Sequence, residues 1–251
     1  MTTTPTTTSS PATDVPATDV TGTIRRCRAT AWILALALTA TAHAAPLPAC
    51  AYEDRPARVV PVGDGRWTVL DTVFGLPATF RPGDLVPARE AGLDDDRLLR
   101  SVVVPDLRAL LAAAAADGVR FELQSAFRDY AYQKRTFAYW VEVDGYERAL
   151  ATSARAGHSE HQLGTAIDLR SAGGPAPWDL EDWAATPEGA WMAANGWRFG
   201  FILSYPAGAE NRSCYAYEPW HWRWVGRETA ARIHASGLVP REALWEVRGE
   251  D

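Results

Sequence analysis

The stretch GHSEHQLGTAID, at residues 157–168, gathers side chains that bind metals and decides how the rest of the chain is interpreted. It contains His161 and Asp168, and a second short stretch, EPWH at residues 218–221, ends in His221. A catalytic zinc ion takes three protein ligands of the His or carboxylate type and leaves a fourth position for water. The sequence therefore predicts that His161, Asp168 and His221 hold one Zn²⁺ ion.

Asp168 is expected on a strand over residues 165–169, where successive side chains point to opposite faces. Ala166 then shares the face of Asp168 and leaves room for a metal ion. Ile167 and Leu169 point the other way, into the core. This alternation predicts a strand with one catalytic face and one buried face.

Glu218 is the predicted catalytic base. Water bound to zinc still needs one group that accepts its proton and one that protonates the leaving amine. Because proline is disfavoured inside a central strand, Pro219 places Glu218 on a bend that leads into a strand beginning near Trp220. The side chain of Glu218 is then free to turn toward the metal.

Arg128 is the predicted clamp for the substrate. It follows the end of an expected strand over residues 119–123, and its planar guanidinium group fits a carboxylate. An enzyme that acts on free C-termini needs such a group. Taken singly, each of these side chains has a plainer interpretation, such as a histidine satisfied in the core, a turn-forming aspartate or a surface ion pair. The combination is what favours a catalytic site.

Three blocks of sequence resemble the signature of the VanY-type D-alanyl-D-alanine carboxypeptidases, relatives of the D-alanyl-D-alanine dipeptidases and of Hedgehog-like folds. The blocks are SAFR at 125–128 with Gln133, SEHQLGTAID at 159–168, and EPWHWRWVG at 218–226. They occur in family order and cover roughly residues 105–226. The resemblance implies the same zinc ligands, the same base and the same clamp, and it adds Ser125, Gln133 and Ser159 as substrate-binding residues.

The resemblance also implies a Hedgehog/DD-peptidase-like α+β fold, with a small antiparallel sheet flanked by helices. The order of the expected elements agrees, because helices and strands are interspersed without regular βαβ repetition. Further helices are expected at 105–116, 130–141, 146–154, 188–195 (with Gly196 as its C-cap), 228–235 and 241–247, and further strands at 198–204 and 220–225. We expect three parts: a polar leader and signal peptide (1–44), an N-terminal arm or subdomain (45–100) and the catalytic domain (101–251).

The first 44 residues predict export. Three arginines (25, 26 and 28) precede a short apolar run at 29–41, and Ala42-His43-Ala44 fits a signal-peptidase site, with cleavage after Ala44. A retained membrane anchor is the alternative. The mature chain then keeps Cys50 and Cys214, which predict one disulfide in an oxidising compartment. A lipid on Cys50 and two free thiols are the other interpretations.

Length and charge limit the classes of function. A chain of 251 residues that is 47% hydrophobic can bury a core. A formal charge of −6 and a pI near 5.4 exclude a surface that collects phosphate backbones, so nucleic acid is not an expected partner. A membrane is expected only through an uncleaved signal or a lipid anchor, and the chain is expected to be monomeric.

The predicted function is that of an exported zinc D,D-carboxypeptidase of the periplasm, cell wall or extracellular space. It removes the C-terminal D-residue from peptidoglycan stem peptides. The alternatives are an L,D-carboxypeptidase, a dipeptidase or a peptidoglycan endopeptidase of the same fold. A wall-binding module without activity is the alternative from another class, and such a module has no need of Glu218 beside three ligands.

Overall fold

The computed structural model describes residues 45–59 and 65–247 of the protein. The predicted leader, signal peptide and cleavage site lie outside these described residues. Within the described ranges, no helix combines the length and the apolar character that crossing a membrane requires. The described residues all belong to one compact unit.

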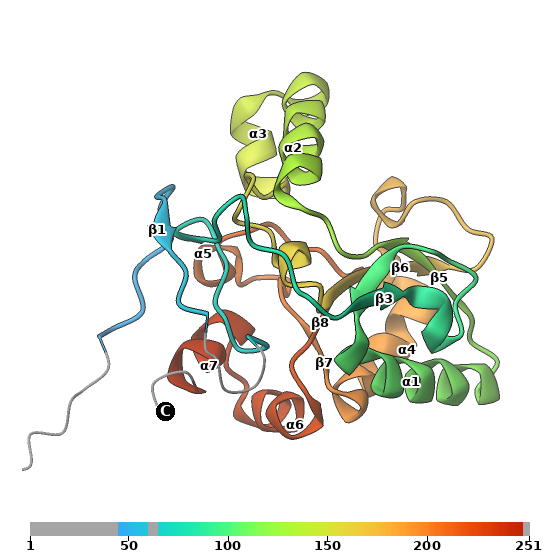
Figure 1. Ribbon diagram of the computed structural model, residues 1–251. Helices are drawn as coiled ribbons and strands as arrows, with labels where there is room; N and C mark the ends of the chain where they lie inside the picture. Colours follow the sequence, from blue (N-terminus) through green and yellow to red (C-terminus); the bar gives the residue numbers. More distant parts are fainter. Residues whose placement is uncertain (1–44, 60–64, 248–251) are drawn as a thin grey trace, which may run out of the picture. The chain divides into compact units, whose positions relative to one another are not determined.

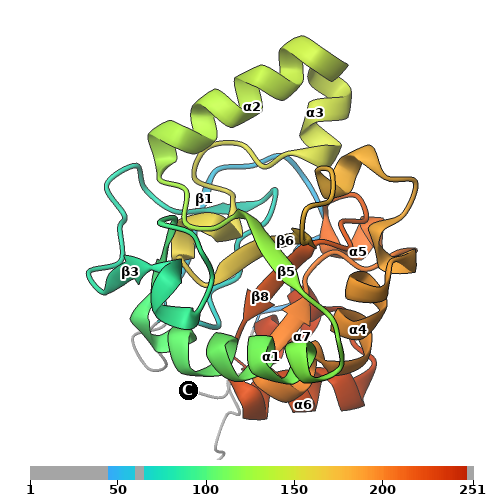
Figure 2. The ribbon, with the colours of Figure 1, turned by 90° about the vertical axis from the view of Figure 1, so that its right-hand side faces the viewer.

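Figures 1 and 2 show the arrangement of the helices and strands. The strands are β1 (Arg55–Pro56), β2 (Phe74–Gly75), β3 (Leu85–Pro87), β4 (Leu98–Arg100), β5 (Phe121–Ser125), β6 (Ala166–Ser171), β7 (Phe201–Leu203) and β8 (His221–Trp224). The helices are α1 (Val104–Ala116), α2 (Tyr130–Asp144), α3 (Tyr146–Thr152), α4 (Pro187–Asn195), α5 (Glu210–Ser213), α6 (Arg227–Ser236) and α7 (Pro240–Val247). Short 3₁₀ turns include η3 (Glu160–Leu163), η4 (Pro177–Asp179) and η6 (Gly196–Phe199).

Four strands form an antiparallel sheet in the order β5-β6-β8-β7. One face of this sheet is apolar, because Ile167, Leu169, Trp222 and Trp224 all belong to the main core cluster. Side chains alternate along each strand, so Asp168 on β6 and the buried polar residues His221 and Arg223 on β8 face the other way. The sheet therefore separates a hydrophobic core from a polar, chemically active face, as the alternation in the sequence predicted.

Helix α1 covers the apolar face, as its sequence predicts. Pro105 stands in the first turn, where its missing N–H costs no hydrogen bond. Leu107, Leu110 and Ala114 recur at helical spacing and are fully buried. The helix ends at Ala116, and Gly118 follows with a φ of +79° that L-residues rarely adopt.

The segment after α4 differs from its prediction. The predicted C-cap of α4, Gly196, is confirmed, but where a strand was expected over 198–204 the chain continues through η6 and forms only the short strand β7. Gly196 caps α4 in a right-handed helical conformation, and Gly200 takes the left-handed one with a φ of +88°. A Cβ on Gly196 would lie 2.9 Å from the ring of Trp222, so this glycine is required by packing.

The N-terminal arm completes a second core with the C-terminal helices. Val69, Val73 and Phe74 pack in one buried cluster with residues of α6 and α7, among them Leu244. The buried carboxylate of Asp71 accepts a hydrogen bond of 2.6 Å from Nε of Arg241 on α7. The arm therefore packs as part of the same unit as the helices that follow the catalytic segments, while the boundary near residue 100 stays a prediction.

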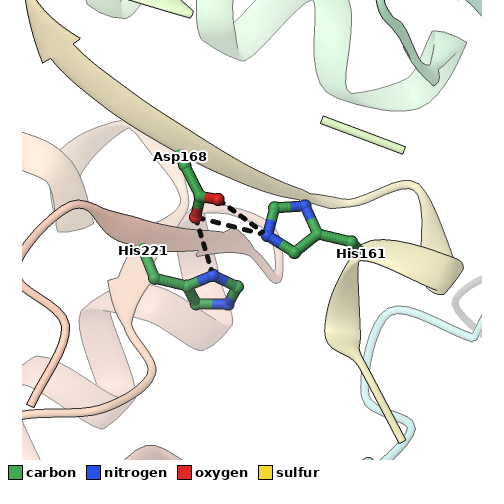
Figure 3. Close-up of side chains that lie close together, drawn as sticks. All are labelled: His161, Asp168 and His221. Atoms are coloured by element: carbon green, nitrogen blue, oxygen red, sulfur yellow. Dashed lines mark hydrogen bonds and ion pairs between the residues drawn. The ribbon is translucent and has the colours of Figure 1, made fainter. Parts of the chain in front are cut away.

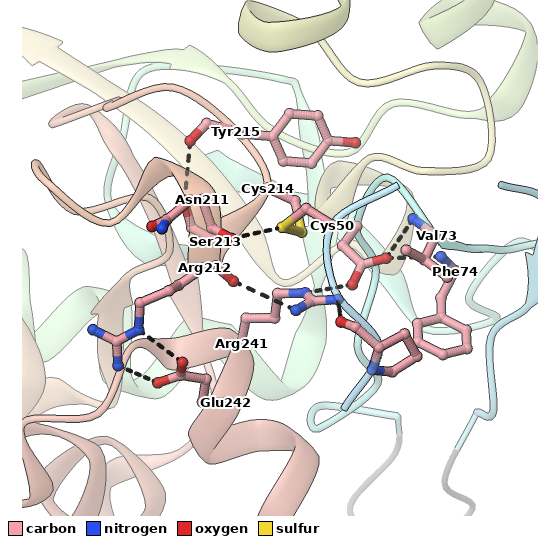
Figure 4. The surroundings of a disulfide bond; sticks show 12 residues. Cys50, Val73, Phe74, Asn211, Arg212, Ser213, Cys214, Tyr215, Arg241 and Glu242 are labelled. Atoms are coloured by element: carbon pink, nitrogen blue, oxygen red, sulfur yellow. Dashed lines mark hydrogen bonds and ion pairs between the residues drawn. A yellow bond between two sulfur atoms is a disulfide. The ribbon is translucent and has the colours of Figure 1, made fainter. Parts of the chain in front are cut away.

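The predicted disulfide is present between Cys50 and Cys214, with an S–S distance of 2.06 Å (Figure 4). It joins the arm to the residue that follows α5, across a sequence separation of 164 residues. Cys214 adopts a φ of +72°, which is uncommon for a residue with a side chain. The covalent bond fixes this backbone conformation a few residues before Glu218.

Breaking this disulfide is expected to destabilise the protein by about 3–5 kcal/mol, because it releases a long loop in the unfolded chain. Urea unfolding of the oxidised and the reduced protein measures the difference. The double variant Cys50→Ser/Cys214→Ser should match the reduced protein and should not respond to reductant. Equal stability of the oxidised and reduced forms would contradict the prediction.

Candidate active site

Three strands bring one row of side chains together across the polar face of the sheet. In the register of the sheet, Asp168 on β6 lies opposite His221 on β8 and opposite Ser125 on β5. An irregularity between Leu123 and Ser125 shifts β5 so that Ser125 reaches this row. Directly opposite residues in antiparallel strands have their Cβ atoms about 4.5–5.5 Å apart, so their side chains interact.

His161 reaches the same row from η3, just before β6 (Figure 3). The hydroxyl of Ser159 accepts a hydrogen bond from the His161 N–H at 3.3 Å and caps the turn. Gly164 ends the turn with a φ of +73°, which lets the chain bend sharply into β6. The turn and the glycine together aim the imidazole at Asp168.

The predicted ligand set is a geometric cluster. His161, Asp168 and His221 each offer one ligand atom, and these atoms all lie within 4.8 Å of one another. All three residues are buried, with exposures of 1%, 5% and 3%. Their roles as ligands remain a proposal, but no backbone movement is needed to bring them together.

The hydrogen bond on the far side of His161 indicates that a cation belongs in this cluster. Its Nδ1 lies 2.6 Å from the carbonyl oxygen of Ala126, which only accepts, so Nδ1 carries the proton. Burial lowers the pKa of His161 to about 4, so the ring is neutral at pH 7. Its Nε2 then presents a lone pair to the carboxylate of Asp168 at 3.2 Å. Two facing lone pairs repel unless a cation lies between them, so the residues fit a metal ion.

Glu160 holds the imidazole of His221 in place, a role that the sequence did not predict. Its carboxylate lies 3.0 Å from Nε2 of His221, which leaves Nδ1 to face Asp168 at 3.0 Å. Burial alone would raise the pKa of Glu160, but Arg223 and the His221 hydrogen bond outweigh it and lower the pKa to about 2. Nothing in the sequence distinguishes this glutamate from a solvated one, because only tertiary contacts bury it.

The charge of His221 depends on these two carboxylates. Burial alone would lower its pKa, but the hydrogen bonds to Asp168 and Glu160 raise the pKa to about 10. The same contacts hold the pKa of Asp168 well below its usual range, against the effect of burial. Both carboxylates are therefore ionised at neutral pH, and Asp168 has the charge that a ligand of a divalent cation needs.

Glu218 lies beside the cluster, as predicted, because Pro219 and Trp220 form a turn. The His221 N–H donates to the carbonyl oxygen of Glu218 at 3.1 Å, which closes this turn just before β8. The Glu218 carboxylate lies 4.0 Å from Nδ1 of His221 and its side chain is 17% exposed. Burial raises its pKa to about 7, the range in which a carboxylate exchanges protons most readily at neutral pH.

The predicted substrate-binding residues occupy different positions. Arg128 lies 4.0 Å from the Asp168 carboxylate, and its buried Nε has no hydrogen-bond partner among the described residues. Gln133 on α2 is buried, donates to the carbonyl oxygen of Ala154 at 2.7 Å and leaves its Oε1 without such a partner. Ser125 is half-buried in the row of Asp168, whereas the hydroxyl of Ser159 is engaged in capping η3. Arg128 and Gln133 therefore have free capacity for a ligand.

Comparison with known proteins places the chain in a family. Residues 96–227, more than half of the 251-residue chain, match the family described as VanY, D-alanyl-D-alanine carboxypeptidase. The chain belongs to the VanY family. The D-alanyl-D-alanine carboxypeptidase of Enterococcus faecalis (strain ATCC 700802 / V583) is 34% identical to it over 151 residues. The match covers 57% of this chain and 54% of the relative, so the chain spans about half of that protein's length.

Solved structures confirm the predicted α+β fold of the VanY family and its Hedgehog/DD-peptidase-like relatives. The structure of a variant of the D,D-pentapeptidase VanY in complex with Zn(II) has a TM-score of 0.61 and 27% identity, over 71% of this chain and 98% of that chain. The structure of the LD-carboxypeptidase LdcB has a TM-score of 0.63 and 25% identity, over 77% of this chain and 97% of that chain. One fold therefore serves both cleavage specificities.

The raised pKa of Glu218 predicts a pH-dependent stability for the protein kept free of metal by chelator. The folded state holds this proton up to about pH 7, whereas an unfolded glutamate loses it near 4.5. Ionisation of Glu218 therefore costs stability as the pH rises between these values. Glu218→Gln, which stays neutral, should be more stable than the unaltered protein above pH 7, by about 1–3 kcal/mol.

Urea unfolding of both proteins at pH 4.5, 6 and 8 measures this difference. The gain should fall below about 0.5 kcal/mol at pH 4.5, where the folded glutamate is neutral and only about half of the unfolded glutamate is ionised. Glu228→Gln, at an exposed position of α6, is the matched control and should give no pH-dependent gain. A gain from Glu218→Gln that is the same at all three pH values would contradict the interpretation.

Proposed function

We propose that this chain is a zinc-dependent D-alanyl-D-alanine carboxypeptidase that removes the C-terminal D-residue from peptidoglycan stem peptides. One observation carries the proposal: Glu218, with a pKa near 7, stands beside the buried cluster of His161, Asp168 and His221. A VanY variant of the same fold was solved as a Zn(II) complex. These three residues hold the zinc ion in this proposal.

A zinc ion held by these residues would lower the pKa of a bound water toward about 7 and would polarise the scissile carbonyl. Glu218 accepts the proton of the attacking water and returns it to the nitrogen of the leaving D-residue. Its pKa suits both steps, because the carboxylate is neither permanently ionised nor permanently protonated at neutral pH. The hydrogen bonds of Ala126 and Glu160 keep both imidazoles oriented throughout.

Arg128 gives the reaction its preference for a free C-terminus. Its guanidinium lies at the cluster with an unused buried N–H, and its side chain is 19% exposed, so a substrate carboxylate can reach it. An Arg–carboxylate pair fixes direction as well as position. The residue that leaves is then the last one, because its carboxylate is held at a fixed distance from the metal ligands.

The place of action is outside the cytoplasm. The Cys50–Cys214 disulfide supports this, because disulfides persist in oxidising compartments. The substrate, peptidoglycan, lies there as well. In this proposal the stem peptide is the partner, the chain acts as a monomer, and residues 1–44 direct its export to the periplasm, cell wall or extracellular space.

Cleavage of an L,D bond is the second candidate, since the LD-carboxypeptidase LdcB shares the fold. A mass-spectrometric assay separates the candidates. We expect the protein to release one alanine from a pentapeptide stem that ends in D-Ala-D-Ala, and a chelator to stop the release until zinc is restored. Loss of two residues would indicate a dipeptidase. Cleavage of only the tetrapeptide would indicate L,D specificity, and no cleavage would contradict the proposal.

Two substitutions separate the base from the ligands. Glu218→Ala should retain zinc and lower kcat by about 10²–10⁴-fold, the contribution of a general acid–base group. His161→Ala should lose the metal itself, because only two ligands remain. Metal analysis and peptide hydrolysis are measured on the same samples, with Glu228→Ala as the control for loss of a glutamate. Normal hydrolysis by Glu218→Ala would rule out its role as base.

A further inference from the structure

Helix α2 carries aromatic side chains that the core of the protein does not use. Among its 15 residues, only Gln133 is buried, although the helix contains five aromatic residues. Figures 1 and 2 show α2 and α3 as a hairpin that stands away from the helices packed on the sheet. Tyr132, Tyr139 and, on α3, Tyr146 are each more than half exposed, at 52%, 58% and 54%. Exposed apolar surface of this kind marks a binding site more often than a structural need.

Part of this surface forms a continuous row of rings. Trp220 contacts Trp178 on η4 with ring centroids 6.1 Å apart, and Trp178 contacts Trp140 on α2 at 6.0 Å. Trp140 in turn contacts Tyr139 at 5.2 Å. We call these four residues the aromatic row. All three contacts are T-shaped, so in each of them the edge of one ring meets the face of the other.

The aromatic row begins at the active site. Trp220 is the residue before His221 and belongs to the turn that places Glu218. The loop that carries Trp178 is attached to the same segment a second time, because the hydroxyl of Tyr217 donates to Asp182 at 3.3 Å. The outer end of the row is therefore linked through Trp220 to the turn that carries Glu218, and the Trp220 ring itself packs against the main core cluster.

The surroundings of the outer end favour a ligand with many hydrogen-bond donors. Asp179 follows Trp178 directly, Asp144 lies one turn after Trp140 on α2, and both are exposed. Asp144 also lies 3.8 Å from Nε of Arg148 on α3, so one basic residue stands beside this carboxylate. Exposed carboxylates accept hydrogen bonds from hydroxyl and amide groups.

We propose that the outer part of the aromatic row, Trp178, Trp140 and Tyr139, binds an N-acetylated amino-sugar ring of the glycan to which the stem peptide is attached. This inference rests on the proposed function. An extended peptide of five residues spans roughly 17 Å, and the three ring-to-ring steps of 6.1, 6.0 and 5.2 Å limit the distance between Trp220 and Tyr139 to no more than a comparable length. A stem peptide whose last residue lies at the metal cluster is therefore long enough to bring its sugar to the outer rings.

The sugar presents C–H groups on the faces of its ring and hydroxyl and amide groups around its edge. The C–H faces pack on the indole and phenol rings, and the edge groups donate to Asp144 and Asp179. A sugar with apolar faces and a polar edge therefore matches a site that combines aromatic rings with carboxylates. The row therefore distinguishes glycan-attached stem peptides from free peptides, although the bond that is cut is the same.

Binding of a peptide-free sugar tests the site without relying on catalysis. The probe is the hexamer of N-acetylglucosamine, and calorimetric titration or tryptophan fluorescence gives its Kd. Trp178→Ala and Trp140→Ala should each weaken binding about fivefold to tenfold, as expected for one lost stacking contact. Trp178→Phe should retain most of the affinity. Tyr52→Ala, at a residue of the arm that is 53% exposed and outside the row, is the matched control and should change nothing.

Kinetics supply the second test. The unaltered protein should hydrolyse a disaccharide-pentapeptide with a higher kcat/KM than the free pentapeptide, through a lower KM. In Trp178→Ala the ratio of the two kcat/KM values should fall toward one. Equal kcat/KM values for the unaltered protein, or a hexamer that does not bind, would overturn the proposal even if the free peptide is cleaved.

The two proposals fail separately. If the hexamer binds through Trp178 but no peptide is hydrolysed, the proposed catalytic function is wrong and the sugar site stands. The same variants test two other occupants of this surface, a second copy of the chain and a membrane. Sedimentation detects self-association, and vesicle binding detects contact with a membrane. Self-association, or binding to phosphatidylglycerol vesicles, that requires Trp178 while the hexamer does not bind would overturn the sugar site in favour of a second copy or a membrane.

Discussion

The pairing of Asp168 with His221 across two antiparallel strands is the constraint on which the rest of the active site depends. The strand register places these residues directly opposite each other, on the face of the sheet that turns away from the core. A shift of β8 by one residue would move His221 to the opposite face and leave Asp168 without it. Burial of Ile167 and Trp222 in the core fixes the register, so hydrophobic packing on one face determines the geometry of the proposed metal ligands on the other.

Each histidine is then oriented by the hydrogen bond on its far side. Ala126 accepts from His161, and Glu160 lies against His221. Glu160 is itself held by Arg223 at 2.6 Å, and the Arg223 guanidinium donates to carbonyl oxygens of the N-terminal arm at residues 66 and 68. A continuous chain of contacts thus leads from the arm to the metal cluster. Residues 66 and 68 lie outside the matched family segment, yet their carbonyl groups support one of the proposed ligands through Arg223 and Glu160.

Strand β8 and the turn before it serve three purposes in a few residues. Trp222 and Trp224 pack in the core, His221 belongs to the cluster, and Trp220 begins the aromatic row. The proposed sugar site on η4 and α2 is linked to this turn through the contact between the rings of Trp178 and Trp220. Such a link lets a substrate bound at the outer rings present its last peptide bond at a fixed position.

The sequence by itself determined the chemistry of the site and most of its scaffold. The types of His161, Asp168, His221 and Glu218, the stop signals of α1 and the cysteine pair predicted the cluster, the helix and the disulfide, because these depend on local pattern and on side-chain chemistry. Only the tertiary structure decided the role of Glu160, the packing function of Gly196 and the aromatic row. These features depend on which residues, distant in sequence, become neighbours once the sheet fixes its register, and no local pattern encodes that.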